Sequence, residues 1–227
     1  MATVLALHAA VADIPLLTGS TIARLTEEGH RVIAATFTGD EPAAVANSLG
    51  AARAENLGHG IDLEASDAAA QLADRVVEFA SNEQIDLILG YDSIGVVHEA
   101  AHVLVHEVGD AVAERLGAPT VEAAISRELV NRGAQVAKTL RKTVPFSEEQ
   151  IAQFRPKAEL AYDIPTKRTF DRKWDAMKAA GGGSDQFSQL LARGMRFPKL
   201  VVSPLFQHEY FGVGKGEAPA FFTALAK

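Results

Sequence analysis

The sequence predicts an α/β fold in which a mostly parallel sheet carries helices on both faces. Short apolar runs at residues 4–7, 31–37 and 85–89 have the length and composition of buried strands. Segments with helical patterning separate these runs, and this alternation is typical of parallel sheets. At 227 residues the chain is long enough to bury a large core in one α/β domain.

The expected helices begin and end at recognisable signals. Thr18 or Ser20 suits the start of a helix that Gly29 ends, and Gly58 and Gly117 would end two later helices. We therefore expect a loop over residues 9–15 and helices over residues 18–28, 43–57, 67–81 and 98–116.

The chain after Pro119 has a different texture, with shorter and more polar segments. Residues 120–129 and residues 135–144 each fit either a strand or a helix. A helix is expected over residues 166–180 and a strand over residues 200–202. A surface tail is the expected place of His208 and Glu209, and the alternative is that they reach the crevice from the C-terminal segment. We expect residues 1–117 to form the core of a single domain and residues 118–227 to add a C-terminal α+β extension that completes the ligand crevice.

Composition and missing motifs exclude several classes of function. The chain has no cysteine, so disulfides, thiolate ligands and a cysteine nucleophile are excluded. A net charge of −7 without a basic stripe argues against nucleic-acid binding. The segment Met1–His8 is too short for a signal peptide or a membrane span, so we expect a cytoplasmic protein. The Gly-rich signatures of dinucleotide sites and P-loops, and the G-x-S-x-G of serine hydrolases, are missing from the positions where they would act. A homo-oligomer stays open.

A row of histidines follows the third apolar run. His98, His102 and His106 are spaced four residues apart, so on one helix they would lie above one another. Neutral imidazole is a common zinc ligand, and His98-Glu99-x-x-His102 also spells the helix motif of zinc proteases. Histidines held by ordinary hydrogen bonds in a helix are the alternative, and we favour that structural role for His106.

Polar residues also follow the ends of the other predicted strands. His8 and Asp13 follow the first strand, Asp40 follows the second, and Asp92 follows the third. Ligands of parallel sheets bind beyond the carboxyl ends of the strands. We therefore expect these four residues and the histidine row to surround one crevice.

The order of these motifs resembles the PIG-L/LmbE-like zinc de-N-acetylases. That family opens with a strand, an A-H-P-D-D motif, a G-G-T-I-A helix start and a T-x-G-E loop, and it continues with a Y-D strand end and an H-P-D-H helix. The similar segments here, which cover roughly the first 117 residues, are Val4-Leu5-Ala6-Leu7-His8, Thr18-Gly19-Ser20-Thr21-Ile22-Ala23, Thr36-Phe37-Thr38-Gly39-Asp40-Glu41 and Tyr91-Asp92 through His98 to His102. Residues 170–178 resemble the family's later K-x-A-A-L helix.

The resemblance implies a Rossmann-like fold and a zinc-dependent hydrolase that removes an acetyl group from an N-acetylglucosamine-type substrate. It implies Zn²⁺, or another divalent metal, on His8, Asp13 and His102. The first motif is two residues longer than in the family. If Asp13 takes the place of the family's metal-binding aspartate, Ala12 stands where the family has its general-base aspartate. We expect Glu99 to act as the base instead.

The remaining expected roles follow from the same resemblance. His98 would act as the acid or as a substitute ligand, and Asp40 and Asp92 would contact the substrate, although Asp92 also suits a capping role.

Two alternatives stay open beside a deacetylase or related amidohydrolase. The first is a catalytically altered or inactive relative that binds a small molecule or a partner on the same scaffold. The second takes His98-Glu99-x-x-His102 as a zinc protease, which would need a third metal ligand further along the chain.

Overall fold

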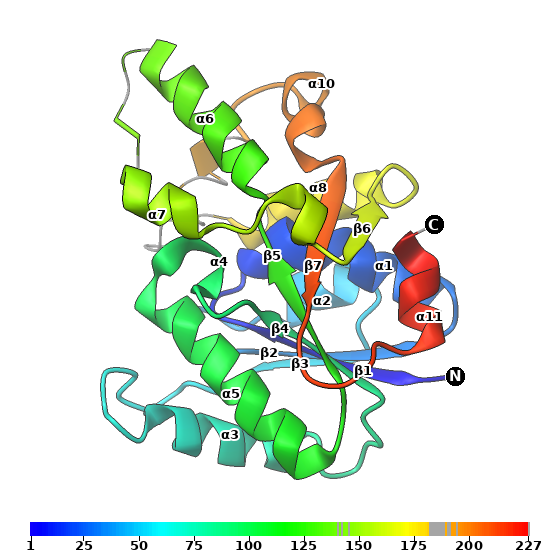
Figure 1. The fold of residues 1–227 in the computed structure, drawn as a ribbon. Helices are drawn as coiled ribbons and strands as arrows, with labels where there is room; N and C mark the ends of the chain where they lie inside the picture. Colours follow the sequence, from blue (N-terminus) through cyan, green and yellow to red (C-terminus); the bar gives the residue numbers. More distant parts are fainter. Residues whose placement is uncertain are drawn as a thin grey trace.

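One seven-stranded sheet organises the molecule (Figure 1). The computed structural model describes residues 1–139, 141, 143–144, 146–181, 189, 192–193 and 195–226. The strand order is β3-β2-β1-β4-β5-β7-β6, in which the first five strands are parallel and β7 and β6 pair antiparallel. The strands are β1 Thr3–His8, β2 Arg31–Thr36, β3 Arg53–Asn56, β4 Leu87–Tyr91, β5 Thr120–Ala124, β6 Tyr162–Pro165 and β7 His208–Val213.

Helices cover both faces of this sheet, as predicted. Figure 1 shows α3 (Ala68–Phe79) and α5 (Ala100–Leu116) on one side, and α1 (Gly19–Glu27), α2 (Ala43–Ser48) and α8 (Phe170–Ala180) on the other. A further long helix is α6 Arg127–Thr139. The short helical segments are η1 Ile14–Thr18, α4 Gly95–His98, α7 Glu148–Gln153, η2 Lys157–Glu159, α10 Lys199–Val202, η3 Ser203–Phe206, α11 Ala220–Thr223 and η4 Ala224–Ala226. The fold is therefore α/β and Rossmann-like, and its C-terminal segment extends the same sheet.

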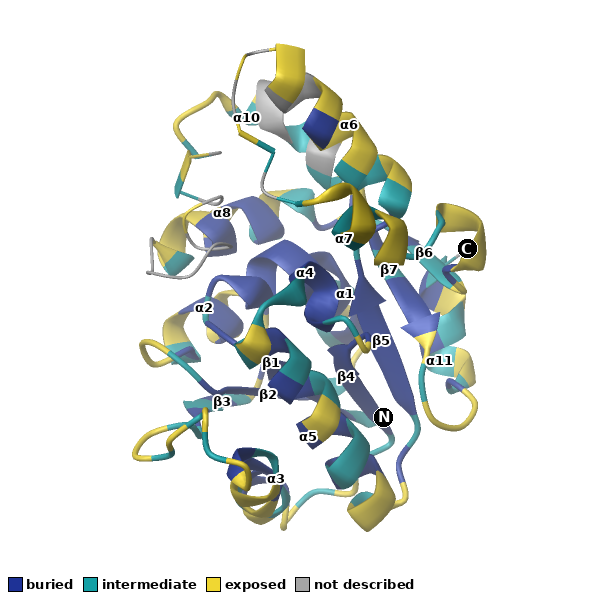
Figure 2. Ribbon diagram, turned by 60° about the vertical axis from the view of Figure 1, so that its left-hand side comes forward, coloured by how far each residue is buried: buried dark blue, intermediate teal, exposed yellow. Residues whose placement is uncertain are grey.

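The core lies between the parallel strands and these helices. Every residue of β4 and β5 is buried, and β1 is buried from Val4 to His8. Figure 2 shows buried residues along β1, β2, β4 and β5 and exposed ones on the outer faces of α3, α6 and α7. Burial on both faces explains why β1 and β4 contain continuous apolar runs rather than alternating ones. No helix in the described part of the chain is long and apolar enough to cross a membrane.

The prediction of one helix over residues 43–57 is wrong. The helix α2 ends at Ser48, and Arg53–Asn56 forms the edge strand β3 beside β2. Gly50 turns the chain between them with a φ of +92°, a conformation that a glycine adopts without strain. Pairing with β2 therefore overrides the helical propensity of this alanine-rich segment.

The late strand is also misplaced by the sequence pattern. Leu200, Val201 and Val202 belong to the short helix α10, and the late strand is β7. Residues 120–129 contain both predicted alternatives, because β5 ends at Ala124 and α6 begins at Arg127. The segment from residue 135 is helical to Thr139, whereas Leu140 and Lys142 lie outside the described residues.

Candidate functional site

Three predicted metal ligands lie together at the carboxyl ends of the parallel strands. His8 is the last residue of β1, Asp13 follows in the next turn, and His102 lies in the first turn of α5. The side chains of Asp13 and His102 are 0% and 1% exposed, and Asp13 Oδ2 lies 3.5 Å from His102 Nε2. The topology therefore gathers two imidazoles and a carboxylate from distant parts of the sequence in one buried place.

Tyr91, the last residue of β4, contacts all three of these residues. Its hydroxyl donates to Asp13 Oδ2 at 3.0 Å and accepts from the amide of Ala9 at 3.3 Å. Its ring lies edge-on to His8 with the centroids 6.0 Å apart, and 5.1 Å from the ring of His102. Asp13 Oδ2 also accepts from the amide of Ala10 at 2.8 Å, so the altered first loop is folded around its own carboxylate.

Thr18 is the hydrogen-bond partner of the His8 imidazole. Its Oγ1 lies 2.8 Å from His8 Nε2 and 3.2 Å from the carbonyl oxygen of Ile14, to which it can donate. When the hydroxyl proton is directed at Ile14, Thr18 Oγ1 accepts from His8, and Nε2 carries the imidazole proton. The other nitrogen, Nδ1, is buried and has no hydrogen-bond partner among the described residues.

Burial keeps His8 in its neutral form. The imidazole is 0% exposed, and removal from water, with the nearby His102 as a second cause, lowers the pKa of His8 to about 3. A neutral ring with a bare Nδ1 is the form of histidine that binds a metal ion.

The approach to α5 is strained. Gly95, Val96 and His98 all have positive φ angles, which is uncommon for valine in particular. Asp92 Oδ1 accepts from the amide of Val96 at 2.8 Å and thereby holds the turn closed. A Cβ on Gly95 would lie 2.4 Å from the amide nitrogen of Val103, so the turn packs directly on the backbone beside His102.

This turn separates His98 from His102. The predicted helix over residues 98–116 is broken, because Glu99 is extended and α5 begins at Ala100. His98 Nε2 donates instead to the carbonyl of Gln150 at 3.3 Å, and its ring lies edge-on to Phe154. The prediction that His98 stacks above His102 on one helix is wrong.

Glu99, by contrast, stays with the buried group. Its Oε2 lies 3.8 Å from His102 Nε2, and 19% of its side chain is exposed. Glu99 is therefore a carboxylate that reaches both the solvent and the imidazole of His102.

The other predicted site residues are placed differently. Asp40 is exposed in the loop after β2. Asp92 is 2% exposed, and burial raises the pKa of its carboxyl group. His106 donates from Nδ1 to the carbonyl of Tyr91 at 3.0 Å, as a structural histidine would.

The donor set suits a divalent ion, although the side chains are not gathered into a closed cage. Two imidazoles and one carboxylate are a common zinc shell that leaves a fourth position open, and the bare Nδ1 of His8 fits such a shell. Within the described residues, no three His, Cys, Asp or Glu side chains converge closely enough to hold an ion. Metal binding therefore requires these side chains to draw closer together.

Two further polar residues beside the group were not predicted as part of the site. The sequence pattern predicts only a helix start at Thr18. Thr36 ends β2 directly opposite His8 in the parallel register, and its buried Oγ1 has no hydrogen-bond partner in the described part of the chain. A polar residue at the end of an apolar run was the available signal for Thr36.

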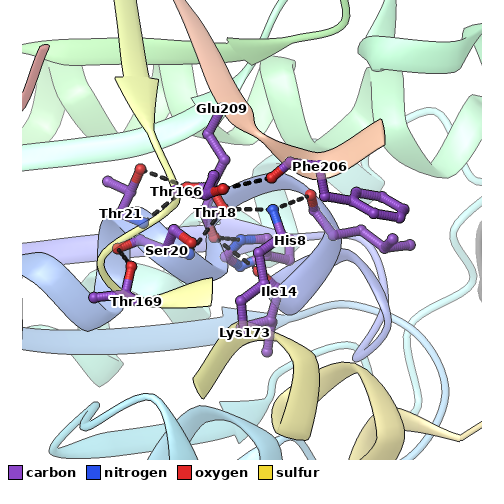
Figure 3. A network of polar contacts seen from close by, with 11 residues as sticks. His8, Ile14, Thr18, Ser20, Thr21, Thr166, Thr169, Lys173, Phe206 and Glu209 are labelled. Atoms are coloured by element: carbon purple, nitrogen blue, oxygen red, sulfur yellow. Dashed lines mark hydrogen bonds and ion pairs between the residues drawn. The ribbon is translucent and has the colours of Figure 1, made fainter. Parts of the chain in front are cut away.

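Glu209 is the clearest correction outside the group. It was expected in a surface tail, but it is 3% exposed and its carboxylate reaches the start of α1 (Figure 3). His208, next to it on β7, is exposed and pairs with Asp163.

Comparisons with known proteins establish the fold and leave the chemistry open. No family model matches the sequence, and no curated protein matches it. Among solved structures, the A40926 pseudoaglycone deacetylase Dbv21 is 15% identical with a TM-score of 0.57, over 95% of this chain and 98% of that one. The N,N'-diacetylchitobiose deacetylase of Pyrococcus horikoshii is 16% identical with a TM-score of 0.52, over 93% and 83%.

A hydratase has a similar structure. The 4-carboxy-2-hydroxymuconate hydratase GalB of Pseudomonas putida KT2440 is 16% identical with a TM-score of 0.57, over 96% of this chain and 98% of that one. At such identities a likeness establishes a shared architecture only. The chain has the fold found in these deacetylases and in this hydratase.

Proposed function

We propose that the chain is a divalent-metal-dependent hydrolase that removes an acetyl group from an N-acetylated sugar or a related small amide in the cytoplasm. The observation that carries the proposal is the buried group of His8, Asp13 and His102 at the carboxyl edge of the sheet. The bare Nδ1 of His8 supports a metal role, because an unpartnered buried imidazole nitrogen is otherwise unfavourable. The deacetylases that share the fold add support at the level of architecture.

Each residue of the group has a proposed task. His8, Asp13 and His102 would hold the ion, which when bound supplies a Lewis acid and lowers the pKa of water. Glu99 is the proposed general base, because its partly exposed carboxylate lies beside His102 whereas Ala12 offers no proton acceptor. Tyr91 and Thr18 orient Asp13 and His8 through the hydrogen bonds that they make.

The positions of Asp40, His98 and Asp92 decide which of their predicted roles we propose. Asp40 is retained as a substrate contact, because it is exposed at the same edge of the sheet. His98 is retained as the proton donor to the leaving amine, and it would have to release Gln150 to act. The carboxylate of Asp92 accepts a hydrogen bond from the amide of Val96, which supports a role in shaping the turn over a role in substrate binding.

The test is the metal content of protein purified without chelators and supplied with Zn²⁺. We expect about one ion per chain in the wild type, and loss of the ion in His8→Ala and in His102→Ala. His59→Ala is the matched control, because His59 is exposed and its imidazole pairs with Glu41, away from the buried group. A metal-free wild type under these conditions would overturn the proposal.

A second candidate is a ligand-binding protein without catalysis on the same fold. Two observations favour it: Ala12 stands where the family has its base, and the described residues form no closed metal cage. Calorimetry with N-acetylglucosamine derivatives, followed by analysis for free acetate, separates the two. Binding without release of acetate by a metal-loaded protein would support the second candidate.

The protease alternative is not proposed. It needs His98 and His102 on one helix face, and the break at Glu99 removes that arrangement.

A further inference from the structure

A buried ion pair joins two C-terminal elements behind the candidate site (Figure 3). Lys173 of α8 and Glu209 of β7 have side chains that are each 1% exposed, and Lys173 Nζ donates to Glu209 Oε1 at 2.7 Å. A buried pair of this kind contributes little net stability compared with well-packed apolar side chains. The groups that contact Lys173 and Glu209 therefore indicate which other role the ion pair has.

The carboxylate of Glu209 holds the first turn of α1. Its Oε1 accepts from the amide of Ser20 at 2.8 Å, and its Oε2 accepts from the amide and the hydroxyl of Thr21 at 2.8 Å and 2.6 Å. A carboxylate at a helix N-terminus satisfies amides that have no partner within the helix and faces the positive end of the helix dipole. Four donors, one of them Lys173, thus fix Glu209 and the start of α1 relative to each other.

The ammonium group of Lys173 holds the segment that precedes α1. Nζ donates to the carbonyl of Leu16 at 3.0 Å. Gly19 accommodates the stem of Lys173, since a Cβ on that glycine would lie 3.3 Å from Lys173 Cγ. Thr18 lies between Leu16 and Ser20, so the ion pair constrains the chain on both sides of Thr18.

Thr18 is the residue that contacts the His8 imidazole, with Oγ1 2.8 Å from Nε2. We infer that Lys173 and Glu209 are positioning residues for His8: they hold residues 16–21 so that Thr18 keeps the bare Nδ1 of His8 directed as a ligand. The inference rests on the proposed function only in assigning metal binding to that nitrogen. The C-terminal segment would then complete the site by setting a first-strand side chain, without supplying a ligand of its own.

The test measures the His8 imidazole in metal-free protein by long-range ¹H–¹⁵N NMR, which distinguishes the two neutral tautomers. The variant is Lys173→Met combined with Glu209→Gln, which removes both charges and keeps the approximate size of the side chains. We expect the wild type to show the single Nε2–H tautomer, and the double variant to show a mixture of tautomers. Thr18→Val, which removes the acceptor itself, should give the same mixture.

The matched control is Arg172→Met combined with Glu27→Gln. Arg172 and Glu27 join the same two helices, α8 and α1, by a 3.3 Å contact at the surface. This control should keep the wild-type tautomer. Should the double variant not fold, Thr21→Val removes one of the four donors to Glu209 and should produce a smaller change in the same direction.

A folded double variant with the wild-type tautomer would overturn the inference and leave the Lys173–Glu209 pair with a packing role alone. So would a wild type in which His8 carries its proton on Nδ1. Titration with Co²⁺, followed by visible absorption, keeps this result separate from the proposed function. If the wild type binds Co²⁺, we expect the double variant to bind it about 10- to 100-fold more weakly. If the wild type binds none, the proposed function fails while the tautomer result still decides the inference.

Discussion

At the scale of single residues, His8 links burial to pH dependence. Its pKa is lowered from 6.5 to about 3, so between these values the unfolded chain binds a proton that the folded chain excludes. Stability is therefore highest above pH 6.5 and falls as the pH decreases toward 3, by about 1.4 kcal/mol per unit for this group.

Urea unfolding of metal-free protein at pH 7 and pH 5 measures this dependence. We expect His8→Leu to lose less stability over that interval than the wild type, because the leucine has no proton to bind. Equal losses in the two proteins would show that His8 does not contribute.

Glu99 carries the second prediction at this scale. Glu99→Gln keeps the shape of the side chain and removes its ability to accept a proton, so kcat on an N-acetylated sugar should fall by about 10²- to 10⁴-fold. Metal content should stay at the wild-type value. Glu107→Gln, an exposed change on α5, serves as the control. Full activity in Glu99→Gln would transfer the role of base to another group.

Part of the candidate site was predictable at this scale, because His8 ends a recognisable strand and His102 belongs to a row of histidines after another strand. Glu209 was not, because its role depends on a contact across a long sequence separation: Glu209 meets Ser20 over 189 residues. Thr18 was not, because its position also suits an ordinary helix start and its contact with His8 depends on the path of the intervening loop. Local sequence patterns predict which residues end a helix or a strand. They do not predict which side chain from a distant part of the sequence contacts that end.

At the scale of elements, the turn before α5 offers a sharp test. Gly95→Ala places a Cβ 2.4 Å from Val103 N and 2.6 Å from His102 C, at a φ of +60°. We expect a loss of more than about 1 kcal/mol in the free energy of unfolding, together with weaker metal binding, because the displaced backbone carries His102.

Gly109→Ala on α5 is the control for this turn. Its Cβ would make an ordinary contact of 3.9 Å with Leu7, so helix propensity should stabilise the protein by up to about 1 kcal/mol. Chemical denaturation of both variants measures the difference. Equal stability of Gly95→Ala and the wild type would mean that the turn adapts freely.

Two errors at the element scale concern helices that the pattern makes too long. The predicted helix over residues 43–57 is interrupted at Gly50, and the one over residues 98–116 begins only at Ala100, after the positive-φ segment Gly95–His98 and the extended Glu99. The long strands and helices follow from periodicity, because burial imposes it on them. A change of chain direction within an alanine-rich or apolar segment does not alter the hydrophobic periodicity, so periodicity does not predict where such a helix is interrupted.

At the scale of the whole molecule, the sheet joins the two segments predicted as core and extension. Both edges of β4 are paired, with β1 on one side and β5 on the other. A fragment of residues 1–117 would expose the β4 edge and remove Lys173 and Glu209 from the start of α1.

We therefore expect the fragment 1–117 to lack a cooperative unfolding transition and to aggregate. Co-expression with residues 118–227 should restore a dispersed ¹H–¹⁵N spectrum. A fragment that unfolds cooperatively by itself would contradict the proposal that residues 1–227 form one domain.

The partnership between Glu209 and α1 also has a consequence for the order of events during synthesis. Ser20 and Thr21 leave the ribosome 189 and 188 residues before their carboxylate partner. At translation rates of about 5–20 residues per second, the first turn of α1 waits roughly 10–40 s for it. Through that interval the residues on both sides of Thr18 lack their C-terminal partners, so the proposed orientation of His8 would be set only when the chain is nearly complete.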